Sequence, residues 1–127
     1  MTPIVPPARV LVVDDDPPVR ETLCDLIANL GHESVSAAGG REALELLAAR
    51  PYDVVITDLF MPEMNGLEFI RRLRELAPEV PVILLTAAPT PEVVTVLRAA
   101  NVLCLRKPVD LVELAAAIRH RVSGPEG

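Results

Sequence analysis

Acidic side chains stand directly after two apolar stretches of this sequence that have the length of a β-strand. The stretch 9–13 is followed by Asp14 and Asp15, and the stretch 54–56 leads to Asp58. A carboxylate at the end of a buried strand is costly to desolvate unless another group compensates for its charge. Carboxylates gathered at one point call for a cation, and one or two carboxylates with water suit Mg²⁺. A carboxylate such as Asp58 can also act as a nucleophile and take up a phosphoryl group as an acyl phosphate.

Two further strand-like stretches end in groups that suit phosphoryl chemistry. Thr86 follows the apolar stretch 82–85, and Lys107 comes shortly after the stretch 102–105. Charge on the transferred oxygens must be neutralised, which a lysine can do, and a threonine adds a neutral hydroxyl. Taken singly, each has a plainer interpretation: a strand-end hydroxyl for Thr86, a solvated charge for Lys107, and a helix cap for Asp16. Together, the four strand ends favour a single site.

The chain alternates between apolar strand patterns and amphipathic helix patterns. We predict strands at 9–13, 34–36, 54–56, 82–85 and 102–105, and helices near 17–30, 41–50, 67–76, 91–100 and from 110 onward. This alternation indicates a doubly wound, flavodoxin-like α/β fold, in which five helices cover a five-stranded parallel sheet. Such sheets bind ligands beyond the carboxyl ends of their strands, where the strand order reverses. With the strand order 2-1-3-4-5, the four strand ends converge on one crevice.

Length and composition limit the classes of function. The 127 residues fit one domain, which we place at 9–122, between a flexible lead-in at 1–8 and a tail or linker at 123–127. The net charge of −6 argues against nucleic-acid binding by this domain, since phosphate contacts need clustered Lys and Arg. No apolar stretch approaches the ~20 residues that span a bilayer, and the first residues lack a signal-peptide pattern. We therefore expect no membrane association and a cytoplasmic location. Cys24 and Cys104 lack metal-ligand spacing, and we expect reduced, structural cysteines.

The motifs at these strand ends resemble those of the receiver domain of bacterial two-component response regulators, which has the fold of the chemotaxis receivers. The resemblance extends over about 9–122. The motifs that carry it are Val-Val-Asp-Asp-Asp at 12–16, Asp58 with Met-Pro-Glu-Met-Asn-Gly at 61–66, Thr-Ala at 86–87, and Lys-Pro at 107–108.

The resemblance implies a metal site and a magnesium cofactor. Asp15 would bind Mg²⁺ directly and Asp14 through water, while Asp58 and the backbone carbonyl of Phe60 would complete the ligand set. It implies further that Asp58 is the residue that accepts the phosphoryl group.

The resemblance also implies a function: a phosphorylation-dependent signalling receiver of a two-component system or phosphorelay. The donor would be a phosphohistidine on a sensor histidine kinase or on a histidine phosphotransfer protein. Thr86 would hydrogen-bond to the phosphoryl oxygens of the aspartyl phosphate, and Lys107, in a cis peptide with Pro108, would form an ion pair with them. The domain would be a switch rather than an enzyme, although it would assist its own phosphorylation and dephosphorylation. Its output would reach a C-terminal effector domain or a downstream protein, and a homodimer could form through helix four, strand five and helix five.

The sequence departs from the family pattern near its last strand. Cys104 stands where the family normally has Tyr or Phe, Val109 replaces a frequent Phe, and Ala100 replaces the usual Gly. We therefore expect that an aromatic side chain does not transmit the signal. Our hypothesis is that the loop 88–91, which begins shortly after Thr86, carries more of the change.

Two other functions remain open on the sequence. A degenerate receiver would act as a protein-interaction module without phosphorylation, an alternative that Cys104 favours and the complete set of site residues opposes. A less favoured alternative is a haloacid-dehalogenase-type phosphatase that uses Asp14 and Asp16 as its Asp-x-Asp motif, which would leave Asp58 unexplained.

Overall fold

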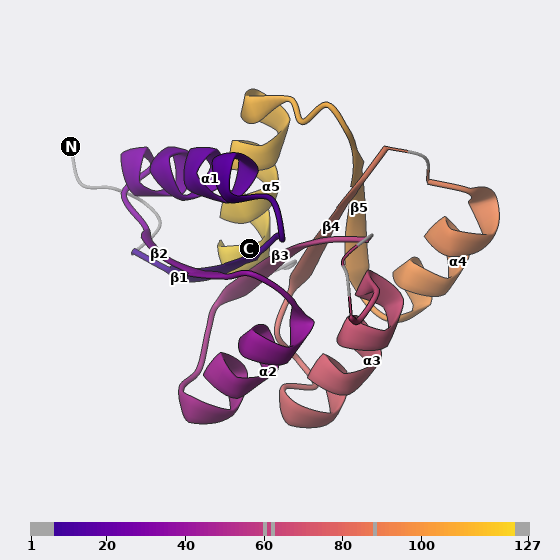
Figure 1. Ribbon diagram of the computed structural model, residues 1–127. Helices are drawn as coiled ribbons and strands as arrows, with labels where there is room; N and C mark the ends of the chain where they lie inside the picture. Colours follow the sequence, from indigo (N-terminus) through magenta and orange to yellow (C-terminus); the bar gives the residue numbers. More distant parts are fainter. Residues whose placement is uncertain (1–6, 60, 62, 88, 124–127) are drawn as a thin grey trace.

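The predicted parallel sheet is present in the computed structural model, which describes residues 7–59, 61, 63–87 and 89–123. Its five strands lie in the order β2-β1-β3-β4-β5, and every neighbouring pair is parallel (Figure 1). The strands are β1 (Arg9–Val13), β2 (Glu33–Ala37), β3 (Val54–Asp58), β4 (Val82–Thr86) and β5 (Val102–Arg106). The doubly wound α/β fold and its strand order are therefore confirmed.

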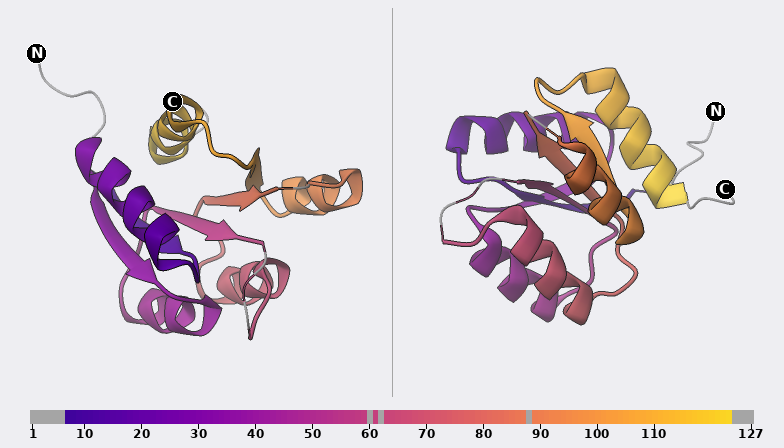
Figure 2. Two further views of the ribbon diagram at one scale, coloured as in Figure 1. Left: turned by 45° about the horizontal axis from the view of Figure 1, so that its top comes forward. Right: turned by 90° about the vertical axis from the view of Figure 1, so that its right-hand side faces the viewer.

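Five helices cover the sheet on both faces. They are α1 (Pro17–Asn29), α2 (Gly40–Ala49), α3 (Gly66–Leu76), α4 (Pro91–Ala99) and α5 (Leu111–Ser123). The views in Figures 1 and 2 place α1 and α5 on one face, α2 and α3 on the other, and α4 at the margin beside β5.

The strands divide their side chains between two hydrophobic cores because successive residues of a strand point to opposite faces. In β1, Leu11 and Val13 belong to the core under α2 and α3, and Val10 and Val12 belong to the core under α1 and α5. Phe69 of α3 is the largest fully buried side chain. Strands buried on both faces read as continuous apolar runs, which is why the sequence revealed them.

Four of the strands, β2 to β5, run one or two residues further than the sequence predicted. Asp58 pairs with Leu85, and Thr86 pairs with Arg106, so the ladder continues to the residues at the site. Asp58 and Thr86 therefore stand on the last residues of their strands, where the sheet fixes their backbone.

An aspartate stands before the first turn of both α1 and α5. Asp110 Oδ1 accepts hydrogen bonds from the backbone N–H groups of Val112 and Glu113, at 2.9 and 3.1 Å, as predicted for a cap. Asp16 also stands at the N-cap position of its helix, but its side chain makes no capping hydrogen bond to the residues that the structure describes. The interpretation of Asp16 as a helix cap therefore holds for its position, without a capping hydrogen bond from its side chain to a described residue. Instead, its backbone N–H donates to Asp14 Oδ1.

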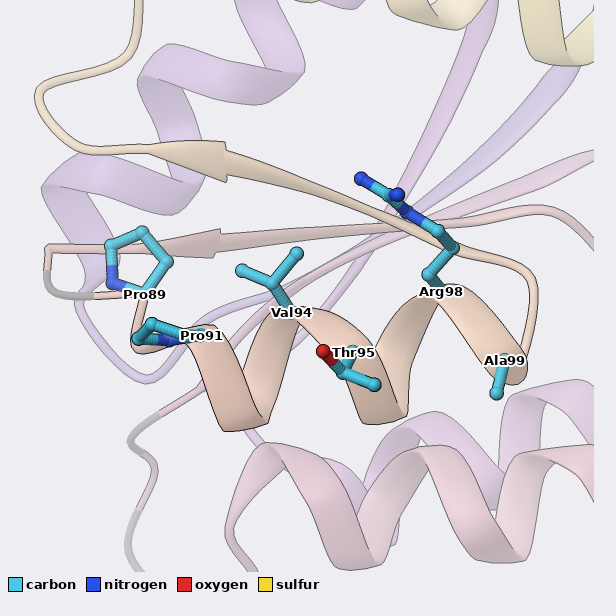
Figure 3. Close-up of a pocket in the computed structure, with 6 residues that line it drawn as sticks. All are labelled: Pro89, Pro91, Val94, Thr95, Arg98 and Ala99. Carbon is cyan, nitrogen blue, oxygen red and sulfur yellow. The ribbon is translucent and has the colours of Figure 1, made fainter.

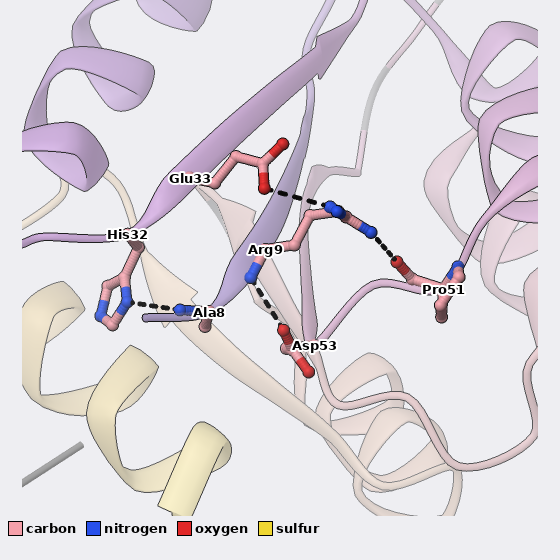
Figure 4. A network of polar contacts seen from close by, with 6 residues as sticks. All are labelled: Ala8, Arg9, His32, Glu33, Pro51 and Asp53. Atoms are coloured by element: carbon pink, nitrogen blue, oxygen red, sulfur yellow. Dashed lines mark hydrogen bonds and ion pairs between the residues drawn. The ribbon is translucent and has the colours of Figure 1, made fainter. Parts of the chain in front are cut away.

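The amino ends of the strands carry their own polar network, shown in Figure 4. Asp53 Oδ2 accepts from the backbone N–H of Arg9 at 2.8 Å, and Arg9 Nε pairs with Glu33 Oε1 at 3.2 Å. His32 Nδ1 accepts from the backbone N–H of Ala8 at 3.0 Å. These contacts join β1, β2 and the segment before β3 at the end of the sheet away from Asp58.

Among the helices that the structure describes, none combines the length and the hydropathy needed to cross a bilayer.

Candidate functional site

Three carboxylates meet at the carboxyl edge of the sheet. β1 and β3 are direct neighbours, and one carboxylate oxygen from each of Asp14, Asp15 and Asp58 lies within 4.8 Å of the other two. Asp14 is 2% exposed, Asp58 is half-buried and Asp15 is exposed. The cluster is thus open on one side and closed on the other, as a site that admits a hydrated ion needs to be.

Backbone contacts fix the acidic pair. The N–H of Asp14 donates to the carbonyl of Ala37 in β2 at 3.1 Å. Arg20, one turn into α1, donates from Nη1 to the carbonyl of Asp14 at 2.7 Å. A guanidinium that donates to a backbone carbonyl holds the chain and does not occupy a carboxylate oxygen. Arg20 therefore positions the acidic stretch while leaving its carboxylates available for a ligand.

Burial raises the pKa of the Asp14 carboxyl, and the negative charges of Asp58 and Asp15 raise it further. The backbone N–H of Asp16 and the charge of Lys107 act in the opposite direction, with smaller effect than burial. A raised pKa means that the folded protein disfavours the ionised carboxylate unless positive charge approaches. Hard oxygen donors from carboxylates, open on one side to water, fit Mg²⁺. The donor set is therefore one that can hold the predicted metal.

Lys107 contacts Asp58 directly. Its Nζ lies 2.8 Å from Asp58 Oδ2, with the lysine side chain 30% exposed and the aspartate side chain 12% exposed. The backbone N–H of Lys107 donates to the carbonyl of Thr86 at 2.8 Å, so the ends of β4 and β5 are joined there. The peptide between Lys107 and Pro108 is cis, as the resemblance implied. Thr86 itself is fully buried at the last position of β4.

Two local features of the loop around Asp58 were not predicted. Thr57 is fully buried, and its hydroxyl donates to the carbonyl of Asp58 at 3.1 Å. Gly66, at the start of α3, donates its N–H to the carbonyl of Leu59, and a Cβ there would lie 2.6 Å from the Asp58 carbonyl oxygen. The Asn-Gly pair at 65–66 signalled a turn, but nothing in the pattern showed this close approach to the strand. The predicted metal ligand Phe60 lies outside the described residues.

Comparison with known proteins identifies this arrangement. A family model described as the response regulator receiver domain matches residues 10–119. The chain belongs to this family.

Relatives and solved structures agree with the assignment. The response regulator MprA of Mycolicibacterium vanbaalenii is 42% identical over 114 residues, which cover 89% of this chain and 49% of MprA. The response regulator protein PilR of Pseudomonas aeruginosa is 35% identical, over 89% of this chain and 26% of PilR. The structure of the Vibrio cholerae chemotaxis protein CheY4 superimposes with a TM-score of 0.82 at 32% identity, covering 89% of this chain and 97% of that one. The chain spans about half the length of MprA and about a quarter of the length of PilR.

The molecule is accordingly a receiver domain, a signalling switch of the two-component type. This assignment overturns the alternative of a haloacid-dehalogenase-type phosphatase, for which Asp14 and Asp16 would have been the motif.

An open groove of about 320 Å³ lies beside the contact between α4 and β5 in this receiver domain. It is lined by Val94 and Arg98 from α4 and by Leu103 and Cys104 from β5. Figure 3 shows Val94 and Arg98 extending from α4 toward the strand. Cys104 is half-buried, and burial raises the pKa of its thiol. The position where the family pattern has an aromatic ring therefore carries a small side chain beside this groove.

A second hollow, of about 390 Å³, lies next to the site. Its lining is mostly apolar and includes Pro18, Val19 and Leu23 of α1 together with Val109 and Lys107. No sequence pattern indicated this hollow, since it forms where α1 meets the segment that joins β5 to α5.

Proposed function

We propose that Asp58 accepts a phosphoryl group and that the resulting aspartyl phosphate switches the output of the domain. The observation that carries this proposal is the cluster of Asp14, Asp15 and Asp58 with Lys107 Nζ on the Asp58 carboxylate. An Asp58 oxygen would attack the phosphorus of a phosphohistidine, the P–N bond would break, and the released imidazole would take up a proton. The new P–O bond is an acyl phosphate, and attack of water on its phosphorus would return the carboxylate and inorganic phosphate.

The residues around Asp58 have separate roles in this proposal. Asp14, Asp15 and Asp58 would hold Mg²⁺, with the carbonyl of Phe60 as the remaining protein ligand. The bound ion would neutralise charge on the transferred oxygens. Lys107 would move its contact from the free carboxylate to a phosphoryl oxygen. Thr86 would donate its hydroxyl to another.

The partners follow from the same site. A phosphohistidine on a sensor histidine kinase or a histidine phosphotransfer protein must approach Asp58 past Lys107, and the apolar hollow beside Lys107 offers a surface for such a partner. The domain would act as a switch rather than as an enzyme with turnover on a separate substrate. A cytoplasmic location and the boundaries 9–122 for the domain belong to the same proposal.

The output surface would lie on α4, β5 and α5. Val96 is 59% exposed and Val112 is 80% exposed on these helices, so apolar side chains are available for an effector domain, a downstream protein or a second copy of the chain. The three carboxylates stand at the ends of β1 and β3, outside these three elements.

The test is intact-mass measurement after incubation with acetyl phosphate and Mg²⁺. We expect one added phosphoryl group, which is lost in Asp58→Asn and in a sample treated with EDTA. Asp53→Asn is the matched control, because it removes a carboxylate from the amino edge of the same sheet, and it should retain the adduct.

One observation favours a second function. Cys104 and the unfilled groove beside it depart from the usual coupling, as expected for a receiver that has become a fixed interaction module. Failure of every sample to form an adduct would support this module and reject phosphorylation. An adduct that persists in Asp58→Asn would mean that another residue is the nucleophile.

A further inference from the structure

A hollow of about 530 Å³ opens at the amino end of the sheet. It is lined by the segments 50–53 and 77–81, which lead into β3 and β4, together with Leu47 of α2 and Arg121 of α5. The strands are all parallel, so this end of the sheet lies opposite the end that carries Asp58. The hollow, which we call the amino-end hollow, is therefore separate from the carboxylate cluster.

Two polar atoms of the lining residues have no hydrogen-bond partner among the residues that the structure describes. Tyr52 is 8% exposed and its hydroxyl is buried, and the Nε of Arg121 is buried as well. A buried donor without an acceptor lowers the stability of a fold, because it has lost water and gained no partner. Two such donors beside one hollow therefore favour a ligand that supplies an acceptor oxygen.

The charge of Arg121 favours an acceptor that is negatively charged. Its Nη1 donates to the neutral amide oxygen of Asn101 at 3.3 Å, and no described carboxylate forms an ion pair with its guanidinium. A hydrogen bond to an ionised group is about twice as strong as one between neutral groups, so a carboxylate gains more here than an amide. Arg121 lies near the end of α5 and is half-buried, which leaves its side chain free to turn toward a ligand.

A second arginine shapes the wall of the amino-end hollow. Arg74, near the end of α3, donates from Nη1 to the carbonyls of Val80 and Ala77, at 2.7 and 3.3 Å. Among the described residues, the partners of this guanidinium are all backbone carbonyls, so its charge is met by carbonyl dipoles and not by a carboxylate. Arg74 is a positioning residue here, because it holds the segment 77–81 in place.

Much of the remaining lining is apolar and rigid. It includes the rings of Pro51, Pro78 and Pro81 and the side chain of Leu47. Proline loses almost no side-chain entropy when an apolar group packs against its ring. The hollow thus places an apolar wall next to its two donors, which matches a ligand that joins a carboxylate to a hydrocarbon body.

Two acidic residues in the lining limit the charge of the ligand. Asp53 and Glu79 are exposed, and Asp53 Oδ2 accepts from the backbone N–H of Arg9 at 2.8 Å (Figure 4). Their negative charges repel a dianion about twice as strongly as a monoanion. A single carboxylate is therefore favoured over a phosphate dianion.

We propose that the amino-end hollow binds a small organic acid that carries one carboxylate on an apolar body. The carboxylate accepts hydrogen bonds from Arg121 Nε and from the Tyr52 hydroxyl, and the body packs against the prolines and Leu47. Both donors are closed to solvent in the free protein, so the ligand enters as the Arg121 side chain turns. The site gives the domain a second, non-covalent input at the end of the sheet away from Asp58, and it does not depend on phosphorylation.

The experiment is an NMR titration of the full chain, labelled with ¹⁵N, in a buffer that contains neither phosphate nor another carboxylate. Phenylacetate is the probe, and phenylacetamide is the matched ligand without charge. We expect phenylacetate to bind with a Kd of about 1–10 mM, the range for a ligand of about ten non-hydrogen atoms, and to shift resonances of 47–53, 77–81 and 118–121. Phenylacetamide should bind roughly fivefold more weakly or worse.

Two results of this titration would overturn the proposal. Equal affinities for phenylacetate and phenylacetamide would reject the role of the carboxylate. The absence of saturable binding up to about 50 mM phenylacetate, or shifts gathered around Asp58 instead of the amino-end hollow, would reject the site itself.

Variants of the two donors test their roles, and Arg119→Gln is the matched control. Arg119 is exposed on the same helix as Arg121 and does not line the hollow. We expect Arg121→Gln to weaken phenylacetate binding by roughly tenfold or more and Tyr52→Phe by roughly threefold to tenfold, with Arg119→Gln unchanged. Tyr52→Phe removes only a hydroxyl that has no described partner, so a loss of binding in this variant does not reflect misfolding. Parent-like affinity in both donor variants would reject the site.

Inorganic phosphate separates charge from the apolar body. It carries negative charge but offers nothing to pack against the prolines, so it should leave the phenylacetate Kd unchanged at equal ionic strength. Competition by phosphate at concentrations similar to those of phenylacetate would show a general anion site and overturn the assignment of the ligand class.

Discussion

The two edges of one sheet treat charge in opposite ways. At the amino edge, Asp53 accepts from the backbone of Arg9 and Glu33 pairs with the Arg9 side chain, so opposite charges meet within the protein. At the carboxyl edge, Asp14, Asp15 and Asp58 face one another, with Lys107 bonded to Asp58. Buried or clustered charge lowers the stability of the fold unless it is compensated. Charge on these residues of the amino edge is therefore compensated within the protein, whereas the carboxyl edge carries an excess of negative charge that, under the proposed function, a cation would offset.

The largest expected effect comes from a pair of glycines, one at each edge. In Gly66→Ala the new Cβ would lie 2.6 Å from the Asp58 carbonyl oxygen and 2.8 Å from Leu59 Cα, a clash with backbone that we expect to cost about 3 kcal/mol. Gly31→Ala meets no atom within 4 Å and suffers only from its φ of 93°, which costs about 1–2 kcal/mol. Urea unfolding with calorimetric Mg²⁺ titration should show both properties weakened in Gly66→Ala and only stability weakened in Gly31→Ala. Equal loss of Mg²⁺ affinity in both would contradict a functional division between the edges.

Asp14→Asn should stabilise the metal-free protein. Burial raises the pKa of Asp14 above its ordinary value of 3.8, so the ionised carboxyl favours the unfolded state. At pH 7 in EDTA, we expect Asp14→Asn to raise the Tm by roughly 2–8 °C.

The stability gained in Asp14→Asn should depend on pH. The advantage should be complete above the raised pKa and should disappear as the pH falls below 3.8, where the carboxyl is protonated in both states. Added Mg²⁺ should raise the Tm of the parent chain and have little effect on the variant, and scanning calorimetry checks both. A variant less stable than the parent in EDTA at pH 7 would refute the view that this edge costs stability.

Tyr52→Phe should have the smallest effect, at the amino edge. Tyr52 is 8% exposed, and its buried hydroxyl has no hydrogen-bond partner among the described residues. Removal of an unsatisfied buried hydroxyl should stabilise the fold by about 1 kcal/mol in urea unfolding and leave phosphorylation unchanged. A clear loss of stability would reveal a partner for this hydroxyl and show that the amino edge is fully satisfied.

The fold and the carboxylate cluster could be predicted because both follow from patterns along the chain. Apolar runs marked four of the strands, and each chemically useful residue stood at the end of one. Parallel strands bring such ends together without any further information. The weaker β2 was expected at 34–36, and its pairing with β1 extends it to Glu33–Ala37.

Contacts in which a side chain is bonded to a backbone carbonyl could not be predicted, either at the site or elsewhere in the fold. Arg20 on Asp14 and Arg74 on Ala100 have no signature in residue type or spacing, since any carbonyl within reach would serve. Small residues carry little information of this kind. In α2, Ala43 is buried and Ala48 is exposed, and the sequence does not distinguish them because alanine contributes little to the amphipathic pattern that sets the phase of a helix.

The sheet lies between the two hydrophobic cores, and this position also restricts how the chain can change in length. Each strand has five residues, and β3 sends Val55 to one core and Val54 and Ile56 to the other. Insertion of a single residue before Asp58 would exchange the two faces and turn the Asp58 carboxylate away from Asp14 and Asp15. Insertions and deletions should therefore be tolerated in the connecting segments and purged from the strands, so that descendants of this chain diverge in loop length while the spacing from Val54 to Asp58 stays the same.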